Sequence, residues 1–245
     1  MRTLTVSVFN RPGYTRELVD ALSVCTGVGG YRVFFLCDRP DGSEACDEVV
    51  DIVRGFGACE SRVFVHGKRL GCNGNVFSAL SLGFRLSDFH VHLEDDCIPG
   101  VDFLSYMGWC GGEFAGCDDV FSVSGYTNAE CVGLAQFFPR SRDLGGVGFR
   151  RHFSPWGWGS WRRSWSEMCG GWLFTDTVDL SWDLKVDRYV RGDRVEVFPF
   201  VARVRDVGAV GGVHVPSAEW HARFAFNEYW VGSVGGYSGG FRAVF

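Results

Sequence analysis

The chain has 245 residues, of which 46% are hydrophobic and 16% aromatic, and its formal net charge is -5. This length allows one large domain or two small ones around a real core, and the composition excludes a mainly disordered or collagen-like protein. The negative charge argues against a general nucleic-acid coat protein, although it is compatible with a local basic surface.

The cysteines and the N-terminus indicate a protein of a reducing compartment. Ten cysteines are scattered singly, without a CxxC pair or zinc-site spacing, so we expect most of them to be buried free thiols. Residues 1–6 lead directly into a strand pattern without a signal-peptide stretch, and no segment has the apolar length of a membrane span. We therefore expect a soluble, cytoplasmic protein, which could be virus-encoded and act in the host cytoplasm.

The first part of the chain alternates between strand and helix patterns. Strands are predicted at residues 4–9, 31–37, 62–65 and 89–93, and helices at residues 15–24, 45–54 and from the Asn-rich segment near 75 to about 84. This alternation is typical of right-handed crossovers and predicts an α/β fold with a mostly parallel central sheet.

The strand at 89–93 stops at three consecutive acids, Glu94, Asp95 and Asp96, and Pro99-Gly100 follows shortly after. The acids therefore lie at the carboxyl edge of the sheet, where ligands bind in open α/β folds. Adjacent carboxylates repel one another, and a hard divalent cation such as Mn²⁺ or Mg²⁺ would keep them ionised and bind a diphosphate. Alternatively, the acids form a solvated turn or cap the helix that begins near Asp102.

Polar side chains follow three other strands of the predicted sheet. Asn10 and Asp38 can hydrogen-bond a base and its ribose, and Arg11 and Arg69 can offset phosphate charge. Each alone is an ordinary turn residue, but a parallel sheet brings all four to one edge. These positions predict a nucleotide site.

The second part of the chain begins with a predicted helix at 102–109 and a strand at 119–125 and then becomes basic and aromatic. Residues 137–165 contain six arginines and one aspartate among eight Phe and Trp residues. This mixture suits the stacking of flat rings or sugars beside anions, or else an aromatic subcore with a solvated arginine rim. Residues 154–161 are rich in Gly and Trp and predict a loop that shapes an acceptor pocket with Trp156, Trp158 and Trp161.

The last part carries two further candidate residues. A helix is predicted at 176–190, with acids at helical spacing that usually form a solvated face, although Trp182 could hold Asp183 beside a pocket. Strands are predicted at 195–200 and 201–207. His214 follows a glycine-rich segment and could swing onto a metal ion.

Together these motifs resemble metal-dependent glycosyltransferases of the GT-A fold, over most of the chain. The chain is similar to the Golgi N-acetylglucosaminyltransferases, which use a Glu-Asp-Asp form of the DxD motif, and to small bacterial and viral relatives. The segments that carry the resemblance are 6–12, Asp38, 69–71, 93–96, 156–159, 182–183 and 211–214.

The resemblance implies a role for each candidate residue. Asp96 would contact the divalent ion, and His214 would complete the metal shell or touch the diphosphate. Asp183 would be the general base. The remaining residues would bind the nucleotide sugar, with the acids serving its ribose and sugar: Asn10, Arg11, Asp38, Arg69, Asn75, Glu94 and Asp95.

The expected reaction transfers a sugar from a nucleoside diphosphate, which we expect to be UDP, to a hydroxyl group. It inverts the configuration of the anomeric carbon. The acceptor would be a saccharide or lipid-linked glycan, or a hydroxymethylated pyrimidine in DNA. Residues 1–110 would form the nucleotide-sugar half and residues 111–245 the acceptor half of one domain. A nucleotidyltransferase of similar fold and a non-catalytic sugar-binding module are the alternatives.

Overall fold

The computed structural model describes residues 2–38, 42–127, 143–172, 181–212, 215–225 and 230–244. The chain up to the acidic run and its following helix contains these elements: β1 Arg2–Val8, α1 Pro12–Ser23, η1 Val28–Gly30, β2 Tyr31–Cys37, α2 Glu44–Arg54, β3 Ser61–Val65, α3 Gly71–Leu86, β4 Phe89–Glu94, β5 Cys97–Pro99 and α4 Phe103–Glu113.

The rest of the chain adds shorter elements, several of them π-helical or 3-10: β6 Val120–Ser124, β7 Gly146–Arg150, β8 Trp158–Trp161, α5 Arg162–Cys169, α6 Trp182–Lys185, η2 Val186–Val190, β9 Val195–Pro199, β10 Val204–Asp206, α7 Ala218–Trp220, η3 His221–Ala225, η4 Val231–Val234 and β11 Arg242–Ala243. None of the described helices combines the length and the hydropathy that crossing a bilayer requires.

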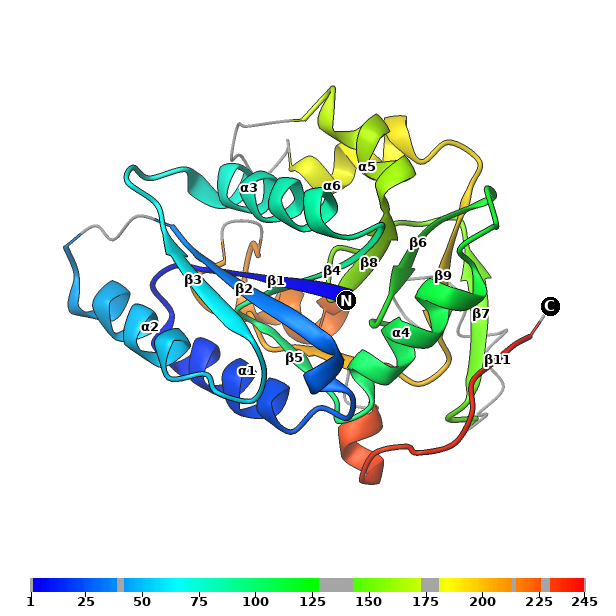
Figure 1. Cartoon of the computed structure of the whole chain (residues 1–245), viewed down its shortest axis with the longest axis horizontal. Coiled ribbons are helices and arrows are strands. Elements are labelled where there is room, and N and C mark those ends of the chain that lie inside the picture. The colour runs from blue at the N-terminus through cyan, green and yellow to red at the C-terminus, as the bar shows by residue number, and fades with distance from the viewer. Residues whose placement is uncertain are drawn as a thin grey trace.

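A nine-stranded sheet runs through both halves of the chain in the order β11-β7-β9-β6-β8-β4-β1-β2-β3 (Figure 1). Strands β4, β1, β2 and β3 are all parallel neighbours, as the alternating pattern predicts. The predicted α/β fold with a mostly parallel central sheet is therefore confirmed. A separate ribbon pairs β5 antiparallel with β10, so that Cys97 lies opposite Asp206.

The sequence predicts a loop for the Gly- and Trp-rich segment at 154–161, but only part of this segment is a loop. Its second half forms β8, which is buried and runs antiparallel between β4 and β6. Gly159 allows this close approach, because a Cβ there would lie 3.0 Å from the carbonyl oxygen of His90 and 2.9 Å from the Phe89 ring. Glycine thus serves tight strand pairing here rather than loop flexibility.

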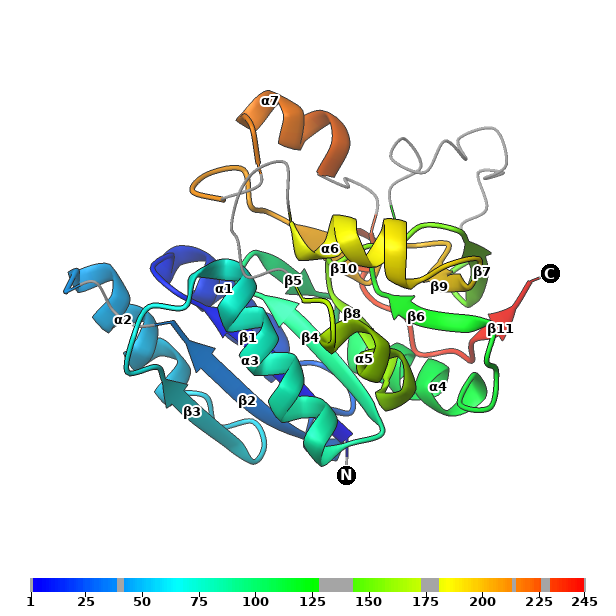
Figure 2. The same ribbon diagram turned by 90° about the horizontal axis from the view of Figure 1, so that it is seen from above.

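Helices cover both faces of the sheet (Figure 2). Helices α1, α2 and α4 bury aliphatic side chains such as Leu18, Val49 and Leu104 against one face. Helix α3 packs against the other face with α5 and α6, around an aromatic cluster that includes Phe84, Trp158, Trp165, Trp172 and Trp182. This aromatic core agrees with the interpretation of residues 137–165 as an aromatic subcore. Of the described arginines there, Arg151 and Arg162 are exposed, whereas Arg150 is buried in an ion pair with Glu196.

The polar face of β4 is buried as well. His90 and His92 lie beneath α3, where the hydroxyl of Thr5 contacts Nε2 of His90 at 2.8 Å and Nδ1 of His92 at 2.9 Å. Gly83 of α3 leaves room for the His90 ring, which a Cβ at that position would overlap. Burial lowers the pKa of each histidine to about 3, so both are neutral.

Candidate active site

The acidic run lies in the turn between β4 and β5, beside the end of β1. Asp95 is buried, whereas Glu94 and Asp96 are partly exposed. Arg11, which follows β1, donates from Nε to Oδ2 of Asp95 at 3.2 Å and places Nη1 2.9 Å from Oδ2 of Asp96. The structure thus brings together the predicted phosphate-binding arginine and the predicted metal ligand.

Burial, together with repulsion from neighbouring carboxylates, raises the pKa of both Glu94 and Asp95. Burial raises the pKa of Asp95 to about 6 against the opposing charge of Arg11. Burial also raises the pKa of Glu94, with further upward contributions from Asp96 and Asp95. Burial alone would lower the pKa of Arg11. The three neighbouring carboxylates outweigh burial, so the pKa of Arg11 is raised. The site has excess negative charge and favours an additional cation.

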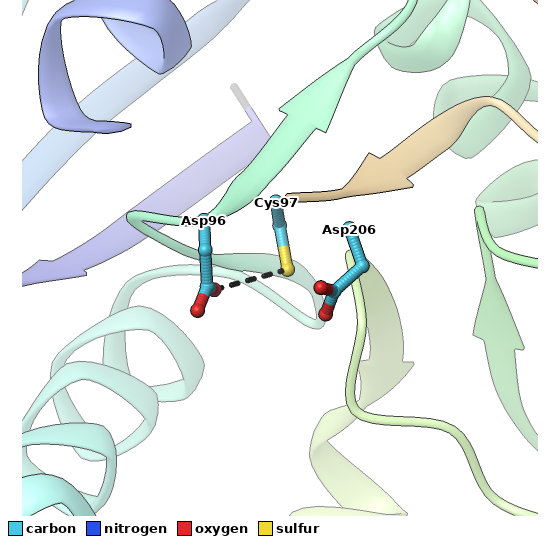
Figure 3. Close-up of side chains that lie close together, drawn as sticks. All are labelled: Asp96, Cys97 and Asp206. Carbon is cyan, nitrogen blue, oxygen red and sulfur yellow. Dashed lines mark hydrogen bonds between the residues drawn. The ribbon is translucent and has the colours of Figure 1, made fainter. Parts of the chain in front are cut away.

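A second carboxylate, which the sequence analysis did not single out, lies beside Asp96. Ligand atoms of Asp96, Cys97 and Asp206 all lie within 4.8 Å of one another, because β5 and β10 pair at this point (Figure 3). Asp206 is held by the backbone N–H of Gly208 at 3.0 Å and by Nε2 of His221 at 2.5 Å. Burial raises the pKa of Asp206, the hydrogen bond with His221 opposes this, and Asp96 raises it further.

The segment after β10 lies over the acidic run. Gly208 is so close to the Asp96 carboxylate that a Cβ there would overlap it, and a Cβ on Gly211 would lie 3.6 Å from Cδ of Arg11. Gly208 therefore allows the segment to approach Asp96 closely. His214 lies outside the described residues, so its predicted metal contact stays a prediction.

The predicted nucleotide residues mainly hold the strand ends in place. Asp38 accepts hydrogen bonds from the backbone N–H groups of Leu70 at 2.7 Å and Gly71 at 2.9 Å, which fixes the start of α3. Asn75 is buried and donates from Nδ2 to the carbonyl of Leu36 at 3.0 Å. Both residues lie at the predicted edge of the sheet, and their side chains position its loops.

The other two predicted nucleotide residues are exposed at the same edge. The Arg69 guanidinium lies 4.6 Å from the centre of the Phe9 ring, so it joins the loop after β3 to the end of β1. Asn10 follows directly and is exposed. Their side chains are accessible to a ligand at this edge, and their contacts with a nucleotide remain a prediction.

Asp183 is positioned by the aromatic core. The neighbouring Trp182 stacks on Trp172 at 5.0 Å between ring centres, with an interplanar angle of 17°, and contacts Trp158 at 5.8 Å. Asp183 is partly exposed at the start of α6, and its charge contributes to raising the pKa of Glu94. The buried tryptophans thus fix the start of α6, which carries Asp183.

The predicted acceptor pocket needs a correction. Trp158 and Trp161 are buried in β8, and Trp158 is 0% exposed, so neither ring is accessible to an acceptor in this structure. Trp156 is partly exposed and packs edge-on against Tyr126 at 4.6 Å. Only Trp156 keeps the predicted role. Trp158 and Trp161 lie in a strand that is paired on both sides and buried on both faces, so their rings belong to the core.

No protein-family model and no curated protein matches the sequence. Solved structures do match the fold. The mannosyltransferase PcManGT of Pyrobaculum calidifontis, in complex with GDP-Man and Mn²⁺, has a TM-score of 0.56 at 12% identity and covers 81% of this chain and 54% of its own. Residues 1–349 of S. aureus TarS, in complex with UDP-GlcNAc, have a TM-score of 0.59 at 12% identity and cover 89% of this chain and 61% of their own.

This likeness shows that the chain has the fold of these glycosyltransferases. The chain spans only about half to three fifths of the length of the two structures. The sequence analysis missed Asp206 and His221. Asp206 is a single acid at a strand end, and it lacks the run of three acids before Pro-Gly that identified residues 94–96. His221 carries no such signal, because it reaches Asp206 only through the packing of η3.

Proposed function

We propose that this protein is a glycosyltransferase that moves a sugar from a nucleoside diphosphate to a hydroxyl acceptor. We expect the nucleoside diphosphate to be UDP. The observation that carries the proposal is the convergence of Arg11, Asp96 and Asp206 at the carboxyl edge of the sheet. It is supported by the shared fold with two glycosyltransferase structures that contain GDP-Man and UDP-GlcNAc. The nucleotide would lie along the loops that carry Asn10 and Arg69.

The chemistry of the acidic cluster fits a divalent cation. Asp96 and Asp206 offer carboxylate oxygens and Cys97 a sulfur within 4.8 Å, and oxygen ligands suit Mn²⁺ or Mg²⁺. Asp96 and Asp206 would hold the ion, with His214 as a further ligand, and when bound it would offset the negative charge of the leaving diphosphate. Arg11 would contribute positive charge to the same phosphates.

Asp183 would act as the general base of an inverting displacement. It would take the proton of the acceptor hydroxyl as the hydroxyl oxygen bonds to the anomeric carbon, while the bond from that carbon to the diphosphate oxygen breaks. The upward effect of the Asp183 charge on the pKa of Glu94 supports this role. Glu94 and Asp95 would contact the ribose and the sugar.

Two acceptor classes suit this chemistry, a saccharide or lipid-linked glycan and a hydroxymethylated pyrimidine in DNA. Mass spectrometry of reactions with a panel of UDP- and GDP-sugars, with each acceptor class and with MnCl₂ or EDTA, tests the proposal. We expect one donor to give an acceptor product heavier by one glycosyl residue in MnCl₂ and not in EDTA. Transfer of a nucleotidyl group to the acceptor instead of a sugar would contradict it.

A further inference from the structure

A groove of about 780 Å³ lies between α3 and the edge strand β3, away from the acidic cluster. Its floor is formed by Leu36 and Leu82, which pack together with Phe34 and Ala79 beneath it. No strand pairs with the outer edge of β3 in the described part of the chain, and Phe64 on this strand is 40% exposed. The groove therefore presents apolar surface in a concave shape.

The charges around this groove have one sign. Its described lining residues include His66, Lys68, Arg69 and Arg85, and none of the described lining residues is acidic. Lys68, Arg69 and Arg85 are exposed. In a protein whose net charge is -5, this separation concentrates positive potential in one concave surface, which attracts anions.

The positive charges are spread along the groove rather than gathered at one point. Lys68 precedes α3, whereas Arg85 lies near its end, and the eleven helical steps from Gly74 to Arg85 span about 16 Å. The hydroxyl-bearing Ser78 and Ser81 line the groove between them. A single small anion would reach only one end, whereas an extended chain with repeated negative charges would reach both.

We propose that this groove binds single-stranded nucleic acid, with phosphates beside Lys68 and Arg85 and a base on the Phe64 ring. Proteins that bind single strands without sequence preference combine a basic groove with an exposed aromatic ring in this way. The ring packs beside that of Phe34 on the neighbouring strand β2, with 6.2 Å between the ring centres. Arg69, which we expect to bind the nucleotide, also lines this groove, so the variants that test the proposal leave Arg69 unchanged. Binding of the single strand does not require the donor or the metal.

Fluorescence anisotropy with a labelled oligothymidine tests the proposal. With about three phosphate contacts, the affinity should fall about 20-fold between 50 and 200 mM NaCl. The double variant K68Q/R85Q should bind at least tenfold more weakly and show a shallower salt dependence. The control R54Q/R162Q, which removes the same charge outside the groove, should bind oligothymidine like the wild type.

A third variant distinguishes nucleic acid from other polyanions. Phe64→Ser should weaken oligothymidine binding at least fivefold, leave the salt dependence unchanged, and leave the binding of inorganic polyphosphate unchanged. Thermal melting of each variant verifies that it is folded. The proposal is overturned if oligothymidine does not bind at low salt, if K68Q/R85Q binds like the control, or if Phe64→Ser has no effect. Tighter binding of duplex than of single-stranded DNA would also overturn it.

Discussion

Nη1 of Arg11 lies 2.9 Å from Oδ2 of Asp96, so the carboxylate that we expect to hold a metal ion is already paired with a cation. The same guanidinium donates to Asp95, which is buried. Arg11 thus offsets part of the charge of the acidic run, and a bound ion would share Asp96 with it.

Arg11→Gln should lower the thermal stability of the protein and increase the stabilisation by MnCl₂. Removing one partner leaves mostly buried carboxylates uncompensated, which costs up to about 3 kcal/mol. Thermal melting with and without MnCl₂ measures both effects, and Arg16→Gln, in an exposed ion pair with Glu48, is the control. An equal MnCl₂ shift in the variant and the wild type would refute the shared role.

Asp183→Asn should reduce kcat at least about 100-fold and leave the Kd of the nucleotide sugar unchanged, because the proposed base acts on the acceptor. Asparagine retains the shape of the side chain, so the stacking of Trp182 should persist. Steady-state kinetics and donor binding are compared with those of Asp193→Asn, at an exposed position of the same region. A parallel loss of donor binding would assign Asp183 to structure rather than to proton transfer.

Asp206→Asn should weaken Mn²⁺ binding, because it removes one of the two carboxylates of the cluster. His221→Gln should weaken it by about 10-fold to 100-fold, since a group that orients a metal-binding carboxylate contributes indirectly. Titration calorimetry with MnCl₂ measures both variants, and His152→Gln, which is half-exposed, is the control. If Asp206→Asn binds Mn²⁺ like the wild type, Asp206 is not a ligand.

The buried histidines should make the fold sensitive to acid. Their pKa is about 3 in the folded state, compared with about 6.5 when unfolded, so the unfolded state binds more protons below pH 6.5. The stability that they contribute is present above this pH and is lost as the pH falls toward 3. At pH 5 the loss is up to about 2 kcal/mol for each histidine.

His92→Gln isolates this effect from that of the acids. Glu94 and Asp95 have raised pKa values and change stability in the opposite sense, so total stability alone is not informative. Urea unfolding between pH 7 and pH 5 should show a smaller loss for the variant than for the wild type. An equal loss of unfolding free energy in the variant and the wild type between pH 7 and pH 5 would mean that His92 is not buried as a neutral side chain.

Most helices and strands in the first half of the chain could be predicted from the sequence, because their hydrophobic patterns and turn residues are local signals. The strand at 31–37 is found at Tyr31–Cys37, and the acids after 89–93 lie at the expected sheet edge. The strand β8 was missed because its glycine allows close pairing with β4, a contact that depends on distant residues. The tryptophans of this segment therefore looked like a pocket when two of them belong to the core.

The candidate site was predictable where its residues follow strands. Arg11 and Asp96 follow that rule, and their contact is observed. Asp206 and His221 join the site through the pairing of β5 with β10 and the packing of η3, at separations that no sequence pattern encodes. Asp38 lies at the expected edge, where it accepts hydrogen bonds from two backbone N–H groups. Asn75 lies in α3, where it donates to a backbone carbonyl and contacts the His66 side chain.

The central claim is that the acidic cluster and Arg11 together bind a metal-linked diphosphate. Titration calorimetry of UDP and GDP, in MnCl₂ and in EDTA, with the wild type and Asp96→Ala, tests it most directly. We expect one nucleotide to bind the wild type tightly in MnCl₂ and weakly in EDTA, and Asp96→Ala to bind weakly in both. Equally tight binding in EDTA, or binding to Asp96→Ala as tight as to the wild type in MnCl₂, would contradict the claim.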